Sequence, residues 1–266
     1  MTRHPASSFA SLLLGAALGL SGLSGLLTAP ARAADPRQTI AAVKPSIVGV
    51  GSMLPTRSPA IVFVATGWVT GDGLSVITNA HNLATILDSE NKEVLGIVVG
   101  RGTHVEFRPA TLAAIDRERD LAHLRLSGTP LPAMALGDDS TLAEGQSLLL
   151  TGFPLGMVLG MQPVTHRAML SAITPLVLPA ANSRKLDART IAQLARNPIS
   201  VFQLDATALP GNSGSPVYDP ETGLVYGVVN KVLVQGLKET AITHPSGITY
   251  AIPVSFVRQL LLQKTP

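Results

Sequence analysis

The sequence predicts an all-β fold, and two observations support that prediction. Short apolar runs of strand length recur along the chain. Turn-forming residues separate these runs, in keeping with 24 Gly and 20 Pro among 266 residues. The chain contains no cysteine, so burial of a core must stabilise it without disulfides, and its length provides ample material for that core.

Residues 1–33 have the pattern of a secretory signal peptide. Arg3 makes the start positive, residues 11–27 are apolar but rich in Gly and Ser, and the letters ARA at 31–33 fit a small-x-small cleavage site. We expect cleavage before Ala34 and a periplasmic or secreted product, with an uncleaved membrane anchor as the alternative. Residues 34–266 are expected to form one domain, because no linker or internal repeat divides them.

The charge of the expected mature chain excludes two classes of partner. Loss of Arg3 and Arg32 reduces 20 Lys+Arg to 18, against 17 Asp+Glu, which leaves a net charge of +1. No basic run and no interleaving of aromatic with basic residues is present. We therefore expect no nucleic-acid partner, and no membrane partner after cleavage.

Thirteen segments are strand candidates, and the first of them is 46–51. Six more follow in the first half, at 62–64, 68–70, 74–78, 94–99, 105–112 and 121–126. Six lie in the second half, at 147–152, 164–173, 201–204, 215–218, 224–231 and 249–252. Residues 254–263 have the pattern of a terminal amphipathic helix.

A serine between two glycines is the strongest chemical signal, in the run GNSGSPV from Gly211 to Val217. A serine hydroxyl that attacks a carbonyl needs backbone N–H groups aimed at the oxyanion that forms. Gly211 leaves room for a turn that directs its own N–H and that of Ser213 into one small cavity, and Gly214 lets a substrate approach closely. A plain Gly/Asn/Ser turn is the alternative.

A base and its orienting acid stand upstream of this serine. His81 follows a strand, a tight Asp-Gly turn and a second strand, and Asp120 stands at the start of the strand 121–126. Taken singly, His81 could be a strand-end histidine bonded to the backbone. Asp120 could be a surface partner of Arg119 or Arg117.

The segments TNAH (78–81), RDLA (119–122) and GNSG (211–214), in the order His, Asp, Ser, resemble those of trypsin-like (chymotrypsin-fold) serine proteases. The resemblance is closest to the bacterial HtrA/Deg-type protease domain, with some similarity to glutamyl endopeptidases. It extends over residues 36–262 and includes LGDDS (136–140), TGFP (151–154) and GITYAIP (247–253).

This resemblance implies two six-stranded antiparallel β-barrels, with a short N-terminal helix over Pro36–Val43 and the C-terminal helix. The first barrel would carry His81 and Asp120, and the second would carry Ser213. The implied function is that of an exported serine endopeptidase that hydrolyses polypeptides through an acyl-enzyme. Gly211 and Ser213 would supply the oxyanion hole, and no cofactor or metal is needed.

The chain departs from the family's pattern at several places. Asn212 stands where digestive proteases place an aspartate for their new amino terminus, so we expect a site that needs no such activation. Ser215 replaces the usual second glycine of the motif. No PDZ domain is expected after Pro253. Residues 174–200 form an insert, read as a surface excursion with a helix over 187–196 or, alternatively, as a substrate lid.

The expected substrate pocket consists of Thr207, Ala208, Leu209, Val229 and Asn230. Basic-selective relatives place an aspartate at the position of Thr207, and glutamyl endopeptidases place a histidine at that of Val229. Without either charge, the pocket is expected to take a small or medium apolar side chain, because a buried charge would lack a partner. Lys231 at the mouth could instead favour an acidic residue.

Two other functions stay open at this point. One is a catalytically silent, protease-like binding protein of the cell envelope. Ser215, in place of the usual second glycine, would be compatible with a distorted oxyanion loop in such a protein. The other is an esterase, although esterases with this triad usually have the order Ser, Asp, His and a Gly-x-Ser-x-Gly elbow. The remaining histidines considered lack metal-ligand spacing, so no metal site is expected: His104, His123, His166 and His244.

Overall fold

The computed structural model describes residues 35–83, 93–101, 104–156, 160–175, 199–207, 209–230 and 247–263. All of them belong to the compact unit Ala34–Pro266. The expected signal peptide and the helix expected over 187–196 lie outside the described residues. Within the described ranges, no helix has the length and apolar character needed to cross a membrane.

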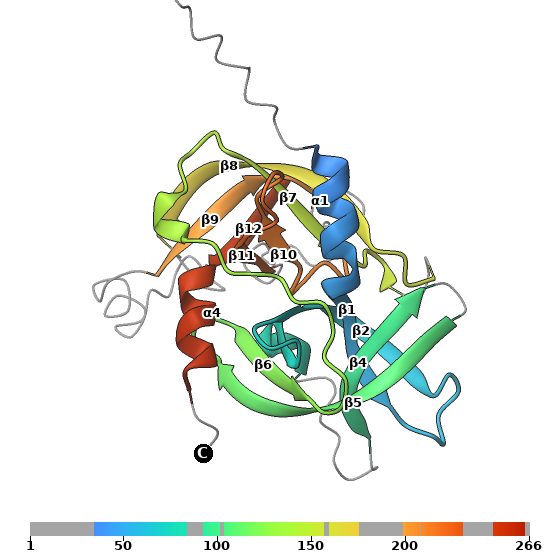
Figure 1. Cartoon of the computed structure of the whole chain (residues 1–266). Helices are drawn as coiled ribbons and strands as arrows, with labels where there is room; N and C mark the ends of the chain where they lie inside the picture. The colour runs from blue at the N-terminus through green and yellow to red at the C-terminus, as the bar shows by residue number, and fades with distance from the viewer. Residues whose placement is uncertain are drawn as a thin grey trace, which may run out of the picture. The chain divides into compact units, whose positions relative to one another are not determined.

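Strands of the first half close into an antiparallel barrel (Figure 1). Their order around it is β1-β2-β3-β6-β5-β4, and β4 pairs with β1 to complete the closure. The strands are β1 (Ile47–Met53), β2 (Ile61–Thr70), β3 (Ser75–Thr78), β4 (Val94–Arg101), β5 (His104–Asp116) and β6 (Leu121–Leu126).

The separation of β2 into two predicted strands is wrong, because residues 62–64 and 68–70 belong to one strand. Between them the register shifts from Val50↔Ala65 to Gly51↔Phe63, which is a bulge that bends β2 without ending it. Gly67 lies in the part of β2 that joins the two predicted strands. Its role is close packing, because a Cβ there would lie 2.8 Å from the Val50 side chain.

The second barrel has the same architecture, with strand order β10-β11-β12-β9-β8-β7. Its strands are β7 (Ser147–Gly152), β8 (Val164–Pro175), β9 (Ser200–Asp205), β10 (Pro216–Tyr218), β11 (Val225–Asn230) and β12 (Ile248–Pro253). The predicted all-β class with two six-stranded barrels is therefore confirmed. The ends of the expected insert differ from the prediction, since residues 174, 175 and 200 are strand.

Two of the three predicted helices lie within the described residues, and both are present. Helix α1 (Pro36–Val43) has the predicted bounds and follows Asp35, whose carboxylate accepts a hydrogen bond from the Arg37 N–H at 3.0 Å. Helix α4 (Val254–Leu261) ends two residues before the predicted end and buries Val254, Val257 and Leu260. Short 3-10 helices stand at η1 (Lys44–Ser46), η2 (Ala80–Leu83) and η4 (Asp139–Thr141).

Three apolar clusters explain how the barrels hold together. One fills the first barrel around Val50, Val76 and Leu124. A second fills the second barrel around Leu148, Leu204 and Val217. The third joins residues of both barrels to α4 and includes the fully buried Trp68 and Tyr218. Because burial of apolar surface is the main favourable term in folding, this third cluster fixes one barrel against the other.

Candidate active site

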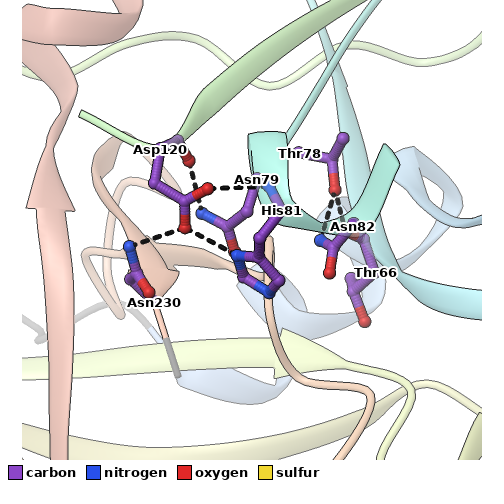
Figure 2. A network of polar contacts seen from close by, with 7 residues as sticks. All are labelled: Thr66, Thr78, Asn79, His81, Asn82, Asp120 and Asn230. Atoms are coloured by element: carbon purple, nitrogen blue, oxygen red, sulfur yellow. Dashed lines mark hydrogen bonds and ion pairs between the residues drawn. The ribbon is translucent and has the colours of Figure 1, made fainter. Parts of the chain in front are cut away.

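His81 and Asp120 form a tight pair at the edge of the first barrel (Figure 2). His81 lies in η2, directly after β3, and Asp120 lies just before β6. The His81 Nδ1 and Asp120 Oδ2 atoms are 2.6 Å apart, and the His81 backbone N–H donates to Asp120 Oδ1 at 2.8 Å. The side chains are 32% and 20% exposed, so the imidazole is held on one side and open on the other.

The backbone of Asp120 has an unusual conformation that aims its carboxylate at His81. Its φ is 54°, in the left-handed region that non-glycine residues avoid, although aspartate tolerates it better than most. The Asn79 side-chain amide and the Ala80 N–H both donate to the Asp120 carbonyl, at 3.0 and 3.2 Å. These two bonds hold the strained turn in place.

Asn230 connects the second barrel to this pair. It is the last residue of β11, and its Nδ2 donates to Asp120 Oδ2 at 2.9 Å (Figure 2). Asp120 Oδ2 thus contacts His81 and Asn230, whereas Oδ1 accepts from the His81 backbone. Sequence reasoning assigned Asn230 to the substrate pocket and missed this contact, which joins residues 110 positions apart.

The loop that carries Ser213 is shaped by backbone hydrogen bonds. Asn212 donates to Leu209 at 3.0 Å, Gly214 to Val229 at 2.9 Å and Ser215 to Asn212 at 3.0 Å. The N–H groups of Gly211 and Ser213 have no acceptor among the described residues. Gly211 has φ 96° and Gly214 has φ 86°, which a side chain would strain. The loop therefore leaves free the two donors that the sequence predicted for an oxyanion hole.

Thr66 of β2 attaches this loop to the first barrel. Its Oγ1 donates to the Gly211 carbonyl at 2.7 Å and accepts from the Phe153 N–H at 3.0 Å, while its N–H donates to the Ser213 carbonyl at 3.1 Å. Thr78 Oγ1 in turn donates to the Thr66 carbonyl and accepts from Asn82 Nδ2 (Figure 2). Nothing in the sequence singled out Thr66, because an ordinary strand threonine has the same local pattern.

Two polar side chains of the serine loop lie close to Gly152. The hydroxyl of Ser215 and the amide of Asn212 are buried, and neither has a hydrogen-bond partner among the described residues. A Cβ on Gly152 would lie 2.0 Å from Ser215 Oγ and 3.0 Å from Asn212 Oδ1. Glycine at 152 thus makes room for the serine that replaces the usual second glycine. Asn212 is fully buried, so it does not reach solvent.

The five expected pocket residues have different surroundings. Thr207 and Leu209 are partly exposed on the segment before the serine loop, whereas Ala208 lies outside the described residues. Val229 is fully buried in the core of the second barrel, and Asn230 directs its amide to Asp120. Of the described members, only Thr207 and Leu209 offer side-chain surface to a substrate, and the pocket stays a prediction.

Three other histidines lie within the described residues, and none of them contacts the His81–Asp120 pair through a hydrogen bond or an ion pair. His123 is buried and His166 is partly buried, and burial lowers the pKa of each imidazole from its ordinary value. Arg125 lowers the pKa of His123 further. His104 is exposed on β5, and His244 lies outside the described residues. No cluster of three His, Asp or Glu side chains suited to a metal ion occurs within the described ranges.

Comparison with known proteins shows the family to which the chain belongs. Residues 65–228 match the family described as Trypsin-like peptidase domain. The chain is 30% identical over 196 residues to Serine protease HTRA2, mitochondrial, of Drosophila pseudoobscura pseudoobscura, which covers 74% of this chain and 38% of that protein. It is 27% identical over 221 residues to Serine protease HtrA-like of Staphylococcus aureus (strain USA300), covering 79% and 24%. The chain thus spans less than half the length of these relatives.

Solved structures share the fold at lower identity. The HtrA-type protease AlgW with tripeptide has a TM-score of 0.58 and 21% identity, covering 85% of this chain and 62% of that one. Deg5 has a TM-score of 0.58 and 20% identity, covering 84% and 90%. With the family match, the fold and the relatives in agreement, the chain belongs to the trypsin-like peptidase domain family, and these relatives are of the HtrA type.

Proposed function

We propose that this chain is a serine endopeptidase in which Ser213 is the nucleophile, His81 the general base and Asp120 the acid that orients it. The contact between His81 Nδ1 and Asp120 Oδ2, at 2.6 Å, is the observation that carries the proposal. A carboxylate that accepts from Nδ1–H selects the tautomer whose Nε2 is free to take a proton. The second bond, from the His81 backbone, keeps the ring from turning away.

Peptide hydrolysis then proceeds in two halves. Ser213 Oγ bonds to the scissile carbonyl carbon while its proton passes to His81 Nε2, and the oxyanion is stabilised by the N–H groups of Gly211 and Ser213. The C–N bond breaks as His81 returns the proton to the leaving amine, which leaves an acyl-enzyme. Water, deprotonated by His81, attacks the ester, and the Ser213 hydroxyl is regenerated as the acid departs.

The same proposal includes the substrate side chain and the destination of the protein. Thr207 and Leu209 offer a neutral pocket surface, which favours a small or medium apolar side chain before the scissile bond over Arg, Lys or Glu.

Residues 1–33 have the pattern of a signal peptide, so we infer export to the periplasm or medium. Mass spectrometry of the exported protein should find Ala34 at the amino terminus. An intact terminus would favour the anchor.

A catalytically silent binding protein is the second candidate, and one observation favours it. Ser215 Oγ and the Asn212 amide are buried without partners among the described residues, in the same loop as the proposed nucleophile. Unpaired buried polar groups destabilise their surroundings by roughly 1–3 kcal/mol each, so the loop could hold a form that cannot stabilise an oxyanion. The paired His81 and Asp120 argue against this candidate, because a silent protein has no need of them.

Covalent labelling with a fluorophosphonate distinguishes the two candidates. The wild type should be labelled, and the labelled peptide should contain Ser213. Ser213→Ala should abolish the label. Ser215→Ala is the matched control: it removes a hydroxyl two residues away that is buried and unpaired among the described residues, so its label should persist. Equal labelling of Ser213→Ala and wild type contradicts the assignment. A folded wild type without label supports the silent protein.

A further inference from the structure

The hairpin turn between β5 and β6 carries Asp120 at its end. The turn comprises residues 117–120, and the pairing of Asp116 at the end of β5 with the first residue of β6 closes it. Arg117 near its start is exposed, and so is the residue after it. Of the turn residues that precede Asp120, only Arg119 has a side chain partly withdrawn from solvent.

Asp116 binds Arg119 at two points. Its Oδ1 accepts a hydrogen bond from the Arg119 N–H at 2.9 Å, and its Oδ2 accepts one from Arg119 Nη1 at 2.7 Å. One carboxylate thus fixes both the backbone and the side chain of Arg119. The sequence left open that Arg119 is a surface partner of Asp120, but its ion pair is with Asp116. The Asp120 carboxylate is therefore left to His81 and Asn230.

Helix α4 supplies the second contact of Arg119. The guanidinium lies over the ring of Phe256, with Arg119 Cζ 4.7 Å from the ring centroid. A cation at this distance is attracted to the face of the ring, and a planar guanidinium stacks well on it. The helix is itself fixed, because Ser255 Oγ donates to Asp139 Oδ2 at 2.7 Å and Val257 is fully buried. Arg119 is thus held between the end of β5 and the helix that follows the second barrel.

The strained conformation of Asp120 needs support on both of its sides. Asn79 and Ala80 bind its carbonyl and so hold the peptide that follows it. Its φ of 54° is the rotation about its N–Cα bond, which depends on where the preceding peptide, that of Arg119, is held. Such a conformation persists only where its surroundings determine it. The contacts of Arg119 hold the side that Asn79 and Ala80 do not reach.

Stability alone does not explain these contacts. The side chains of Arg119 and Asp116 are 29% and 11% exposed, and ion pairs withdrawn from water give little net stability because the attraction is offset by lost hydration. Arg119 Nε is moreover buried without a hydrogen-bond partner among the described residues, which is unfavourable. An arrangement that leaves a donor unpaired and adds little stability points to a role in the site.

We propose that Arg119 and Phe256 are positioning residues, which keep the Asp120 carboxylate aligned with His81 Nδ1. This inference rests on the proposed function, since it concerns the same acid and base. Loss of the contact should lower kcat and leave KM unchanged, because neither residue needs to touch the substrate. A displaced Asp120 also stabilises the protonated imidazole less. The acid limb of the pH profile of kcat/KM should therefore move to lower pH.

Four single variants test the proposal. Arg119→Met keeps a long apolar side chain without the guanidinium, and kcat should fall about tenfold at unchanged KM. Arg117→Met is the matched control, because it removes the same charge from an exposed site in the same turn, and its kcat and pH profile should stay those of wild type. Phe256→Leu should show a smaller loss than Arg119→Met in the same direction. Phe256→Tyr keeps the ring and should retain most of the wild-type kcat.

The double variant Arg119→Met/Phe256→Leu shows whether the two residues act through one contact. Its kcat should be no lower than that of Arg119→Met alone, because the ring has no guanidinium left to hold. Losses that multiply would indicate two independent effects and would overturn the shared role. Thermal denaturation of every variant accompanies the kinetics.

The remaining outcomes decide against the inference. An Arg119→Met protein with wild-type kcat and pH profile overturns it, and so does an equal loss in Arg117→Met, since charge alone would then be responsible. An Arg119→Met protein that is unfolded at the assay temperature also overturns it, because the role is then structural. Fluorophosphonate labelling of Ser213 in wild type keeps the proposed function separate. Folded wild type with neither label nor cleavage overturns that function together with the role of Arg119 and Phe256.

Discussion

The two halves of the site are held in different ways. In the first barrel, the Asp120 carboxylate accepts three hydrogen bonds, two from His81 and one from Asn230, so side-chain chemistry sets the geometry. In the second barrel, backbone bonds and glycines with positive φ shape the Ser213 loop, whereas the Asn212 and Ser215 side chains have no partner among the described residues. The activity should therefore be sensitive to loss of a functional group in the first-barrel half of the site. In the second-barrel half, it should be sensitive to added side-chain volume.

The largest effect is expected from Asp120→Asn, which tests the first half. The substitution keeps the shape but places an amide beside His81 Nδ1, which favours the tautomer whose Nε2 carries a proton and cannot act as a base. We expect kcat/KM for a peptide substrate to fall by about 10⁴, with little change in thermal stability. A loss below tenfold at every pH would show that this half does not depend on the carboxylate.

Gly211→Ala tests the second half. Gly145→Ala is its matched control, since both glycines have a positive φ, 96° and 90°, but a Cβ at 145 meets nothing within 4 Å. Both variants carry the same backbone strain. Only Gly211→Ala should displace the proposed oxyanion donors, with a loss of about 10²–10³ in kcat. Similar kinetics for the two alanine variants would show that strain alone, without crowding, accounts for the effect.

Thr66→Val tests the connection between the halves. The Thr66 hydroxyl bonds to the Gly211 carbonyl and the Phe153 N–H, and valine leaves both unpaired. We expect a loss of about 1–3 kcal/mol in the free energy of unfolding and a decrease in kcat of about tenfold or more. Thr70→Val removes the buried bond to the Met134 carbonyl and should lower stability but not kcat. Denaturation curves and kinetics on both variants check this, and equal kcat values would refute the connection.

The smallest effect on stability is expected for His123. This residue lies on β6, the strand that follows Asp120, and both of its ring nitrogens are unpaired among the described residues. Burial lowers its pKa below the ordinary value of 6.5. The unfolded chain therefore takes up a proton near pH 6.5 before the folded protein does. The stability that this difference provides is present above pH 6.5 and is lost as the pH falls.

His123→Leu removes that titration and should flatten the loss of stability between pH 8 and pH 5.5, with little cost at pH 8. The expected difference is below about 1.4 kcal/mol for each unit by which the pKa is lowered. Urea denaturation of both proteins at a series of pH values measures it. His166 titrates in the same direction and remains in the variant, so part of the slope should persist. Parallel slopes in the two proteins would contradict the assignment to His123.

The sequence predicted the barrels well because strands and turns are local patterns. The order of His81, Asp120 and Ser213 can likewise be read directly from the sequence. It did not predict contacts between distant segments. Asn230 was placed in the pocket because β11 was counted from Ser213, whereas its amide reaches an acid 110 residues earlier. Thr66 was overlooked for the same physical reason: only the approach of the two barrels gives its hydroxyl partners on both Gly211 and Phe153.

The contact between Asn230 and Asp120 also means that the site is completed only after both barrels have been synthesised. Domains generally fold as units, with the amino-terminal part first. A nascent chain that has completed the first barrel carries His81 and Asp120, but it has neither the Ser213 loop nor the amide of Asn230, which enters with β11 of the second barrel. Such a chain lacks the proposed nucleophile. The division of one site between two successive barrels thus leaves the proposed active site incomplete until β11 has been synthesised.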